Sequence, residues 1–388
     1  MENIARLFRD NIRQYGMVLA LLFIVGFFTI LTGGILLNPL NVTNIILQNS
    51  YILILAIGML LVIVAFQIDL SVGSLAAFIG AVSGVLMVTM HMPFWLAMVV
   101  ILLFGAVLGA WHGFWIAYVR IPAFIVTLSG MLLFRGLTYV TLQGQSIGPF
   151  PQEFQLIASG FLPDLFSVAG WGFHNTTLLL GLVASAAFVW SEFSKRRALK
   201  KYGFEPLSLG LTITKLVLIL LALNALCLAL ASYKGIPNVM ILLIALILLY
   251  TFIANKTIAG RHIYALGGNE KAAALSGVKT KRVLFWVFVN MGVMAALSGM
   301  VFAARLNAAT PKAGTGFELD AIAACFIGGA STAGGIGTVM GAMIGALVMG
   351  VLNNGMSLLG VGIDWQQAIK GMVLLLAVTF DVFSKSKG

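Results

Sequence analysis

Long uninterrupted apolar segments constrain this chain more than any other feature of its sequence. They recur from residue 16 to residue 383 and are separated by polar connections. The hydrocarbon core of a bilayer is about 30 Å thick and is crossed by a helix of about 20 apolar residues, because a helix satisfies its own backbone polar groups there. The expected spans are 16–37, 44–66, 70–90, 94–118, 121–142, 176–193, 209–231, 238–254, 283–304, 337–357 and 365–383, with a shorter one at 320–332.

Composition agrees with a single transmembrane domain over residues 1–388. Hydrophobic residues make up 61% of the chain and charged residues 9%, which is too little charge to cover a surface in water. The net charge of +11 does not indicate nucleic-acid binding, because most Lys and Arg fall in loops, where they set membrane orientation. Cys227 and Cys325 lie in separate apolar segments, without a disulfide or metal-binding pattern. We therefore predict an all-α polytopic membrane protein that binds neither nucleic acid nor metal.

Basic residues predict the side of the membrane on which each connection lies. They cluster before the first span, at 195–201, at 256–282 and after the last span, whereas 143–175 has none. Since Lys and Arg are enriched in cytoplasmic loops, twelve crossings that begin inside explain every cluster and place both termini in the cytoplasm. The first span is expected to be retained, because no convincing small-residue cleavage site follows it. The terminal basic residues are Arg6, Arg9, Arg13, Lys385 and Lys387.

We expect ten core spans and one inserted helical hairpin at 176–231, whose two spans flank the basic linker. A weak internal symmetry among the core spans indicates an inverted-topology repeat, because the paired segments occur in the same order and cross in opposite directions. In transporters, such repeats place the substrate path at the interface between the halves. The pairs are 68–69 with 319–320, 105–113 with 341–350, and 129–136 with 370–377.

Polar residues interrupt an apolar stretch at 67–74. A carboxylate in a spanning helix costs about 2.5–3.5 kcal/mol. Asp69 therefore either caps the helix that begins near Leu70 or lines a water-filled break in it, and both readings stay open. Amides in other spans normally bond to neighbouring helices and are weaker candidates for contact with a solute. The candidate path residues are Asn49, Gln67, Asp69, Ser71, Ser74, Asn353 and Asn354.

Two further features concern charge and catalysis. Arg135 and Lys370 are cations in apolar helices at matching repeat positions, so each is expected to be paired or to face an aqueous cavity. The four His are scattered and no HExxH or GxSxG pattern occurs. The glycine-rich run 328–350 lacks the GK[ST] of a phosphate-binding loop, and we expect its glycines at 337, 341 and 345 to serve helix packing. No enzymatic activity is expected.

Four long segments resemble the permeases of monosaccharide ABC importers, the ribose, xylose and galactose group. The chain length and the hairpin at 176–231 are most similar to the xylose or multiple-sugar branch. One departure is Phe66, where the family usually has a small residue. The segments are IDLSVGS at 68–74, PAFIVTLSGMLLFRG at 122–136, GRHIYALGGNEKAAALSGV at 260–278, and the pair 313–331 with 352–360.

The resemblance implies the ABC importer permease fold and import of a monosaccharide, xylose or a related pentose or hexose, across the bacterial inner membrane. It also implies three partners: a second copy of the chain, a periplasmic sugar-binding protein and a cytoplasmic ATPase. ATP and Mg²⁺ are then held by that ATPase, and this chain binds no cofactor.

The loop 256–282 is the expected contact with the ATPase. It is long and basic, so it must lie in water on the cytoplasmic side. We predict a short coupling helix from Tyr264 to Ser276, with Gly267 and Gly268 as its turn and Asn269 as its N-cap. One face of this helix would dock in a cleft of the ATPase. The coupling residues are Tyr264, Gly267, Gly268, Asn269, Glu270, Lys271, Ala273 and Ser276.

Two other functions remain open from the sequence. A proton-coupled secondary sugar transporter with two six-helix halves would be joined at 194–207 and would use Asp69 as its proton site. A channel would conduct without an energy source, but the sequence has no evident selectivity filter.

Overall fold

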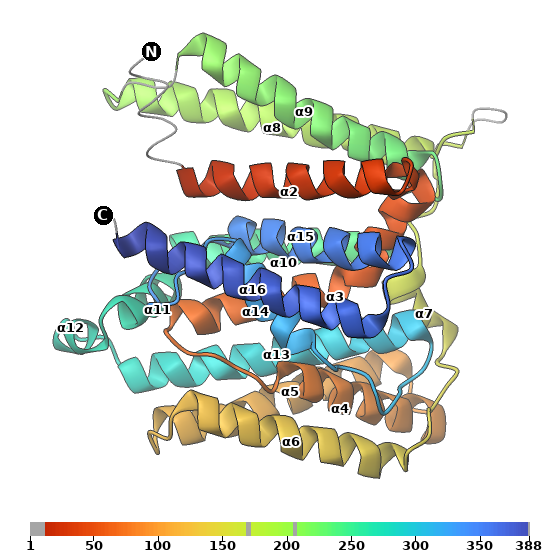
Figure 1. The fold of residues 1–388 in the computed structure, drawn as a ribbon, viewed down its shortest axis with the longest axis vertical. Coiled ribbons are helices and arrows are strands. Elements are labelled where there is room, and N and C mark those ends of the chain that lie inside the picture. The colour runs from red at the N-terminus through yellow and green to blue at the C-terminus, as the bar shows by residue number, and fades with distance from the viewer. Residues whose placement is uncertain (1–11, 168–171, 205–207, 387–388) are drawn as a thin grey trace.

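The computed structural model describes residues 12–167, 172–204 and 208–386 (Figure 1). The terminal residues Arg6, Arg9 and Lys387 lie outside this description. Within it, the regular structure is entirely helical, and nine helices are long and apolar enough to cross a membrane. The expectation of an all-α polytopic membrane protein is confirmed.

The helices follow the expected apolar segments closely. Three short helices, α7, α11 and α12, lie in the connections expected at 143–175 and 256–282. The helices are α2 (Ile12–Leu31), η1 (Ile35–Leu37), α3 (Pro39–Val64), α4 (Val72–Gly84) with a π-helical turn at Val85–Thr89, α5 (Phe94–Ala117), α6 (Ala123–Leu142), α7 (Gln152–Ser159), α8 (Asn175–Lys201), α9 (Leu209–Ala231), α10 (Asn238–Lys256), α11 (Ile258–Gly268), α12 (Glu270–Leu275), α13 (Thr280–Leu306), α14 (Phe317–Ile327), α15 (Val339–Leu358) and α16 (Ile363–Ser386).

Helix α14 is too short to cross the membrane, so the segment 320–332 is not a twelfth spanning helix. Its 11 residues extend about 16 Å at 1.5 Å per residue, roughly half of the hydrocarbon thickness. The chain continues as a non-helical segment at 328–338. The Gly335 N–H in this segment donates to the Val64 carbonyl oxygen at 2.8 Å, at the end of α3. A half-helix followed by a non-helical segment with several turns thus takes the place of a full spanning helix here.

Another broken crossing, the first of the two along the chain, lies between α3 and α4. The residues 65–71 are not helical, and in Figure 1 this stretch runs from the end of α3 towards the middle of the bundle before α4 begins. The two breaks meet, because a Cβ added to Gly73 in the first turn of α4 would collide with the Gly314 carbonyl oxygen and the Glu318 carboxylate. The N-termini of α4 and α14 therefore converge.

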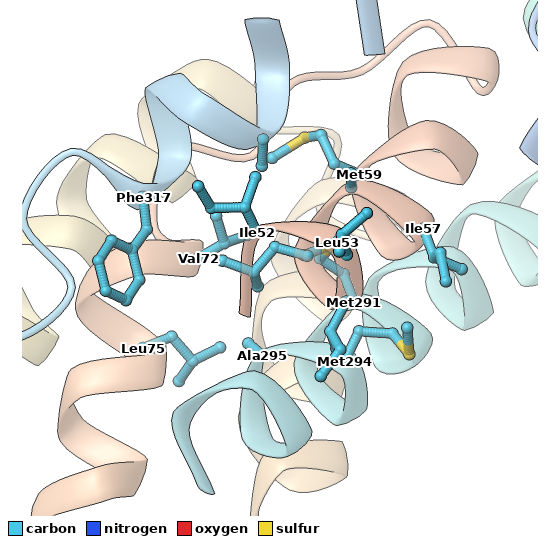
Figure 2. Packing of buried hydrophobic residues seen from close by; sticks show 14 of the residues in the cluster. Ile52, Leu53, Ile57, Met59, Val72, Leu75, Met291, Met294, Ala295 and Phe317 are labelled. Carbon is cyan, nitrogen blue, oxygen red and sulfur yellow. The ribbon is translucent and has the colours of Figure 1, made fainter. Parts of the chain in front are cut away.

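Helix α3 is buried over most of its length, and α13 packs across α3, α4 and α5. Figure 2 shows Ile52 and Leu53 of α3 close to Met291 and Met294 of α13. Small residues allow the closest approach between α5 and α13: a Cβ on Gly292 would lie 2.7 Å from the Gly109 Cα. Glycine is common at such membrane helix contacts because the backbones approach without side chains between them.

The glycines of α15 pack in the same way. A Cβ on Gly341 would collide with the Gly328 carbonyl oxygen, and one on Gly345 with the Ala324 carbonyl oxygen. The packing expected for this glycine-rich run is therefore confirmed. Its partner is the half-helix α14, which α15 holds against the core.

Helices α8 and α9 pack on each other along one edge of the bundle (Figure 1), and α9 contacts α3. An ion pair joins them at the end near their connecting loop: Lys215 Nζ lies 2.7 Å from Glu192 Oε1. The same end of the bundle carries α11 and α12, the start of α2 and the end of α16 (Figure 1).

Candidate functional site

The polar connection at 256–282 folds into two helices rather than one. Helix α11 begins at Ile258, where the Thr257 hydroxyl accepts from the Gly260 N–H at 3.2 Å. It continues through Gly267 and Gly268 because its buried face packs on the core. The expectation of one helix from Tyr264 to Ser276, with these glycines as its turn, is therefore wrong.

Helix α12 begins where it was expected to begin. Asn269 lies between the two helices in an extended conformation, and its side chain accepts from the Ala272 N–H at 2.9 Å. This confirms Asn269 as the N-cap, which satisfies one of the free N–H groups of the first turn. The helix ends at Leu275, and Ser276 is its C-cap.

The exposed face of α12 differs from the expected one. Ala273 is buried against its own chain, so it is not available to a partner. Glu270, Lys271 and Ser276 are exposed, as are Ala272 and Ala274. Leu275 is 91% exposed.

Gly267 holds α11 directly against the start of the first broken crossing. A Cβ at this position would overlap the carbonyl oxygen of Val64 and lie 2.9 Å from the Gly335 nitrogen. Val64 ends α3 just before the break at 65–71, and Gly335 lies in the segment that follows α14. The two breaks and α11 thus meet at one point. We call this contact of Val64, Gly267 and Gly335 the cytoplasmic junction, after the side of the membrane on which the basic residues predict it to lie.

Two side chains reinforce the cytoplasmic junction. The Tyr264 hydroxyl donates to the Gly337 carbonyl oxygen at 2.6 Å, and burial raises the pKa of Tyr264, so the hydroxyl stays protonated at neutral pH. Glu270 accepts from Arg120 at 2.8 Å, which ties α12 to the α5–α6 connection. Both partners of this ion pair are half exposed, so its contribution is at most about 1 kcal/mol. Gly268, in contrast, has open space beside it.

Asp69 lies at the other end of the first break and is almost completely buried. Its Oδ1 accepts from the Ser71 N–H at 2.8 Å and from the Ser71 hydroxyl at 2.6 Å. The Ser74 hydroxyl donates to the Ser71 carbonyl oxygen. Helix α4 begins at Val72, two residues later than the expected start near Leu70. The carboxylate thus holds the turn that leads into α4.

The other candidate path residues are not gathered around Asp69. Asn49 donates to the Ile45 and Gly350 carbonyl oxygens, and Asn354 exchanges hydrogen bonds with Asn41. These amides join α3 to α15, as amides in membrane helices commonly do. Gln67 is half buried in the first break.

A second polar group surrounds the start of α14. Arg135, Lys370 and Asn353 were candidates from the sequence, whereas Glu318, Thr315 and the pairing of Asp320 were not. Lys370 Nζ on α16 lies 3.1 Å from Asp320 Oδ2, and Asn353 lies near the same carboxylate. Arg135 donates to the Thr315 hydroxyl at 3.2 Å. The expectation that each cation is paired or faces an aqueous cavity is confirmed for Lys370, whereas Arg135 has a hydroxyl partner and no ion pair among the described residues.

Glu318 and Asp320 each have one carboxylate oxygen without a hydrogen-bond partner among the described residues, but Glu318 has no ion-pair partner there either. It is buried, and its Oε2 has no hydrogen-bond partner among the described residues. That oxygen faces Gly73, where α4 and α14 converge. The signal for Glu318 and Asp320 was present in the sequence, since two acids within an apolar segment require a reason.

Comparison with known proteins finds relatives over nearly the whole chain. The family described as branched-chain amino acid transport system / permease component matches residues 41–378. The xylose transport system permease protein XylH of Haemophilus influenzae is 39% identical over 97% of this chain and 98% of its own length. XylH of Escherichia coli K12 is 41% identical over 97% and 93%. The ribose import permease protein RbsC of the same strain is 36% identical over 88% and 85%. No solved structure matches the chain.

Proposed function

The chain belongs to the branched-chain amino acid transport system / permease component family, and we propose that within it this protein is the membrane subunit of an ATP-binding-cassette importer for a monosaccharide, with xylose as the favoured sugar. The identity to two xylose permeases over nearly the full length of both chains supports this choice. The protein is a multi-pass membrane protein with a transport role rather than an enzyme.

The observation that carries the proposal is the position of α12. This helix projects from the end of the bundle (Figure 1) and presents Lys271 and Leu275 to water. It is joined through α11 to the cytoplasmic junction, which both broken crossings share. A force applied to α12 would therefore reach both breaks at once. We propose that a cytoplasmic ATPase, which holds the ATP and Mg²⁺, applies this force.

The partners follow from the family and from the charges at bilayer depth. A periplasmic sugar-binding protein would deliver the sugar. Lys370 is a quarter exposed and lies seven residues into α16, about 10 Å from its start. Thr315 is exposed beside Arg135. Charges that face lipid are costly, so we propose that a second copy covers this face and encloses a water-filled path.

The path residues are part of the same proposal. Gln67, Ser71 and Ser74 lie at the first break, and Asn353 lies beside Asp320 at the second. Helix breaks that converge near the middle of a bundle provide polar backbone groups for a solute. Asp69, Asn49 and Asn354 would support this path from behind, because their side chains bond to their own chain. Both termini would lie in the cytoplasm, on the side of α12.

The test is energised uptake of xylose in proteoliposomes. The chain is reconstituted with its ATPase and sugar-binding protein, and the vesicles are loaded with ATP or with a non-hydrolysable analogue. We expect uptake that requires hydrolysable ATP and persists with an uncoupler. Uptake that needs no ATP and stops with the uncoupler would instead favour the proton-coupled secondary transporter. Ribose, galactose and arabinose in the same assay identify the sugar.

A further inference from the structure

The hairpin of α8 and α9 ends in a group of cations that the transport mechanism does not use. Five basic residues occur between 195 and 201, and no acid occurs from 193 to 204. Arg196 faces α9, where it donates to the Thr212 hydroxyl at 3.0 Å. The other four side chains are exposed and make no ion pair with any described residue. They are Lys195, Arg197, Lys200 and Lys201, which we call the hairpin cations.

The length of α8 places the hairpin cations at the membrane surface. The helix has 27 residues, about 40 Å at 1.5 Å per residue, and the hydrocarbon core is about 30 Å thick. Its apolar part ends near Phe193, so the last two turns extend into the headgroup layer. Trp190 is 75% exposed and Tyr202 is 73% exposed, and such side chains are typical of the membrane interface.

Among the described residues, the acid nearest to this end of the hairpin does not neutralise the cations; Glu205, in the connecting loop, lies outside the described residues. Glu192 is paired with Lys215 of α9 at 2.7 Å, and its side chain is mostly buried. The surface of the hairpin end is therefore strongly positive. Helix α8 packs mainly on α9, so its remaining sides face lipid. In Figure 1 the hairpin lies at the edge of the bundle, well away from α12. The hairpin cations are thus closer to lipid headgroups than to an ATPase docked on α12.

From these observations we propose that the hairpin cations form a binding site for anionic phospholipid headgroups of the cytoplasmic leaflet. Lys and Arg at a membrane surface attract anionic lipid, and each contributes about fivefold to the binding constant. The ligand is the phosphate of a lipid such as phosphatidylglycerol, whose acyl chains lie along the exposed apolar sides of α8. Lipid bound at this site would anchor the hairpin to the shell of lipid around the protein. It does not depend on which sugar is transported.

Native mass spectrometry of the full chain in detergent tests this proposal. The protein is titrated with phosphatidylglycerol and, separately, with phosphatidylethanolamine of the same chain length. The variant Lys195→Gln/Arg197→Gln/Lys200→Gln/Lys201→Gln is compared with the control Lys271→Gln/Lys279→Gln/Lys281→Gln/Arg282→Gln. The control removes the same charge from α12 and the start of α13. We expect the wild type and the control to retain phosphatidylglycerol preferentially, and the hairpin variant to bind it at least about tenfold more weakly.

Two outcomes would overturn the site. One is equal binding of both lipids by the wild type, and the other is the same loss of phosphatidylglycerol in the control as in the hairpin variant. If the fourfold variant does not insert, Lys200→Gln/Lys201→Gln replaces it, with an expected loss of at least about fivefold. The charge-preserving variant Lys195→Arg/Arg197→Lys/Lys200→Arg/Lys201→Arg should bind as the wild type does. Free inorganic phosphate that competes as well as the lipid would also contradict a membrane site.

Discussion

At the residue scale, the adjacent residues Gly267 and Gly268 have different roles, although the sequence suggested a single role for both as a turn. Gly267 touches the Val64 carbonyl oxygen, whereas the space beside Gly268 is open. We expect Gly267→Ala to strain the cytoplasmic junction by on the order of 1–3 kcal/mol, as overpacking does, and to lower the sugar imported per ATP hydrolysed. Gly268→Ala is the matched control and should leave this ratio unchanged. The ratio is measured in proteoliposomes, and equal ratios for the two variants would contradict the role of Gly267.

The ion pair of Asp320 and Lys370 gives a second prediction at this scale. Asp320 is almost fully buried, so Lys370→Ala leaves a carboxylate without its cation. Loss of one partner of a buried pair costs about 3–5 kcal/mol. We expect a marked fall in the melting temperature of the detergent-purified chain. The double variant Asp320→Asn/Lys370→Met should recover most of the loss. A double variant that melts no higher than Lys370→Ala would show that the pair is not the cause.

At the scale of elements, the apolar pattern predicted nearly every long helix but not the ends of the short ones. The apolar periodicity cannot separate α11 from α12, because both helices are short. Helix α11 continues through Gly267 because it packs on distant parts of the chain. Periodicity also cannot predict where α14 begins, because its start depends on the tertiary contact with α4 at Gly73. Asn269 was predictable as an N-cap because that preference is local. The partners of Asp320 and Arg135 were not, since they come from distant parts of the chain.

Asp164 gives a prediction at the element scale. Partial burial raises its pKa, but hydrogen bonds from the backbone and hydroxyl of Thr176 and from the Asn175 N–H outweigh this and hold the pKa at about 2. The ordinary value is 3.8, so the charged carboxylate stabilises the start of α8 above about pH 4, and this stabilisation is lost as the pH falls towards 2.

We therefore expect Asp164→Asn to melt below the wild type at pH 6, and the difference to shrink below pH 4. The measurement is the melting temperature of both proteins in detergent over this pH range. Wild-type and variant melting temperatures that differ by a constant amount at every pH would contradict this role of Asp164.

At the scale of the whole molecule, the sequence was sufficient for the class and for most of the spanning helices, but not for the twelfth span expected at 320–332, which is the half-helix α14. It did not reveal that α11 and both broken crossings meet at the cytoplasmic junction. That contact joins Val64, Gly267 and Gly335, which lie far apart in the chain, and it depends on backbone atoms that carry no sequence signature. Through this junction, a movement of α12 would reach both broken crossings of the permease.

The most direct test of this account is ATP hydrolysis stimulated by the sugar-loaded binding protein, measured together with xylose uptake in the same proteoliposomes. The variant Leu275→Asp places a charge on the exposed end of α12. The control Leu199→Asp makes the same change at an exposed leucine of α8. We predict that Leu275→Asp abolishes stimulated hydrolysis and uptake while Leu199→Asp retains both. Uptake and hydrolysis that remain coupled in Leu275→Asp would contradict the central claim that the ATPase drives this permease through α12.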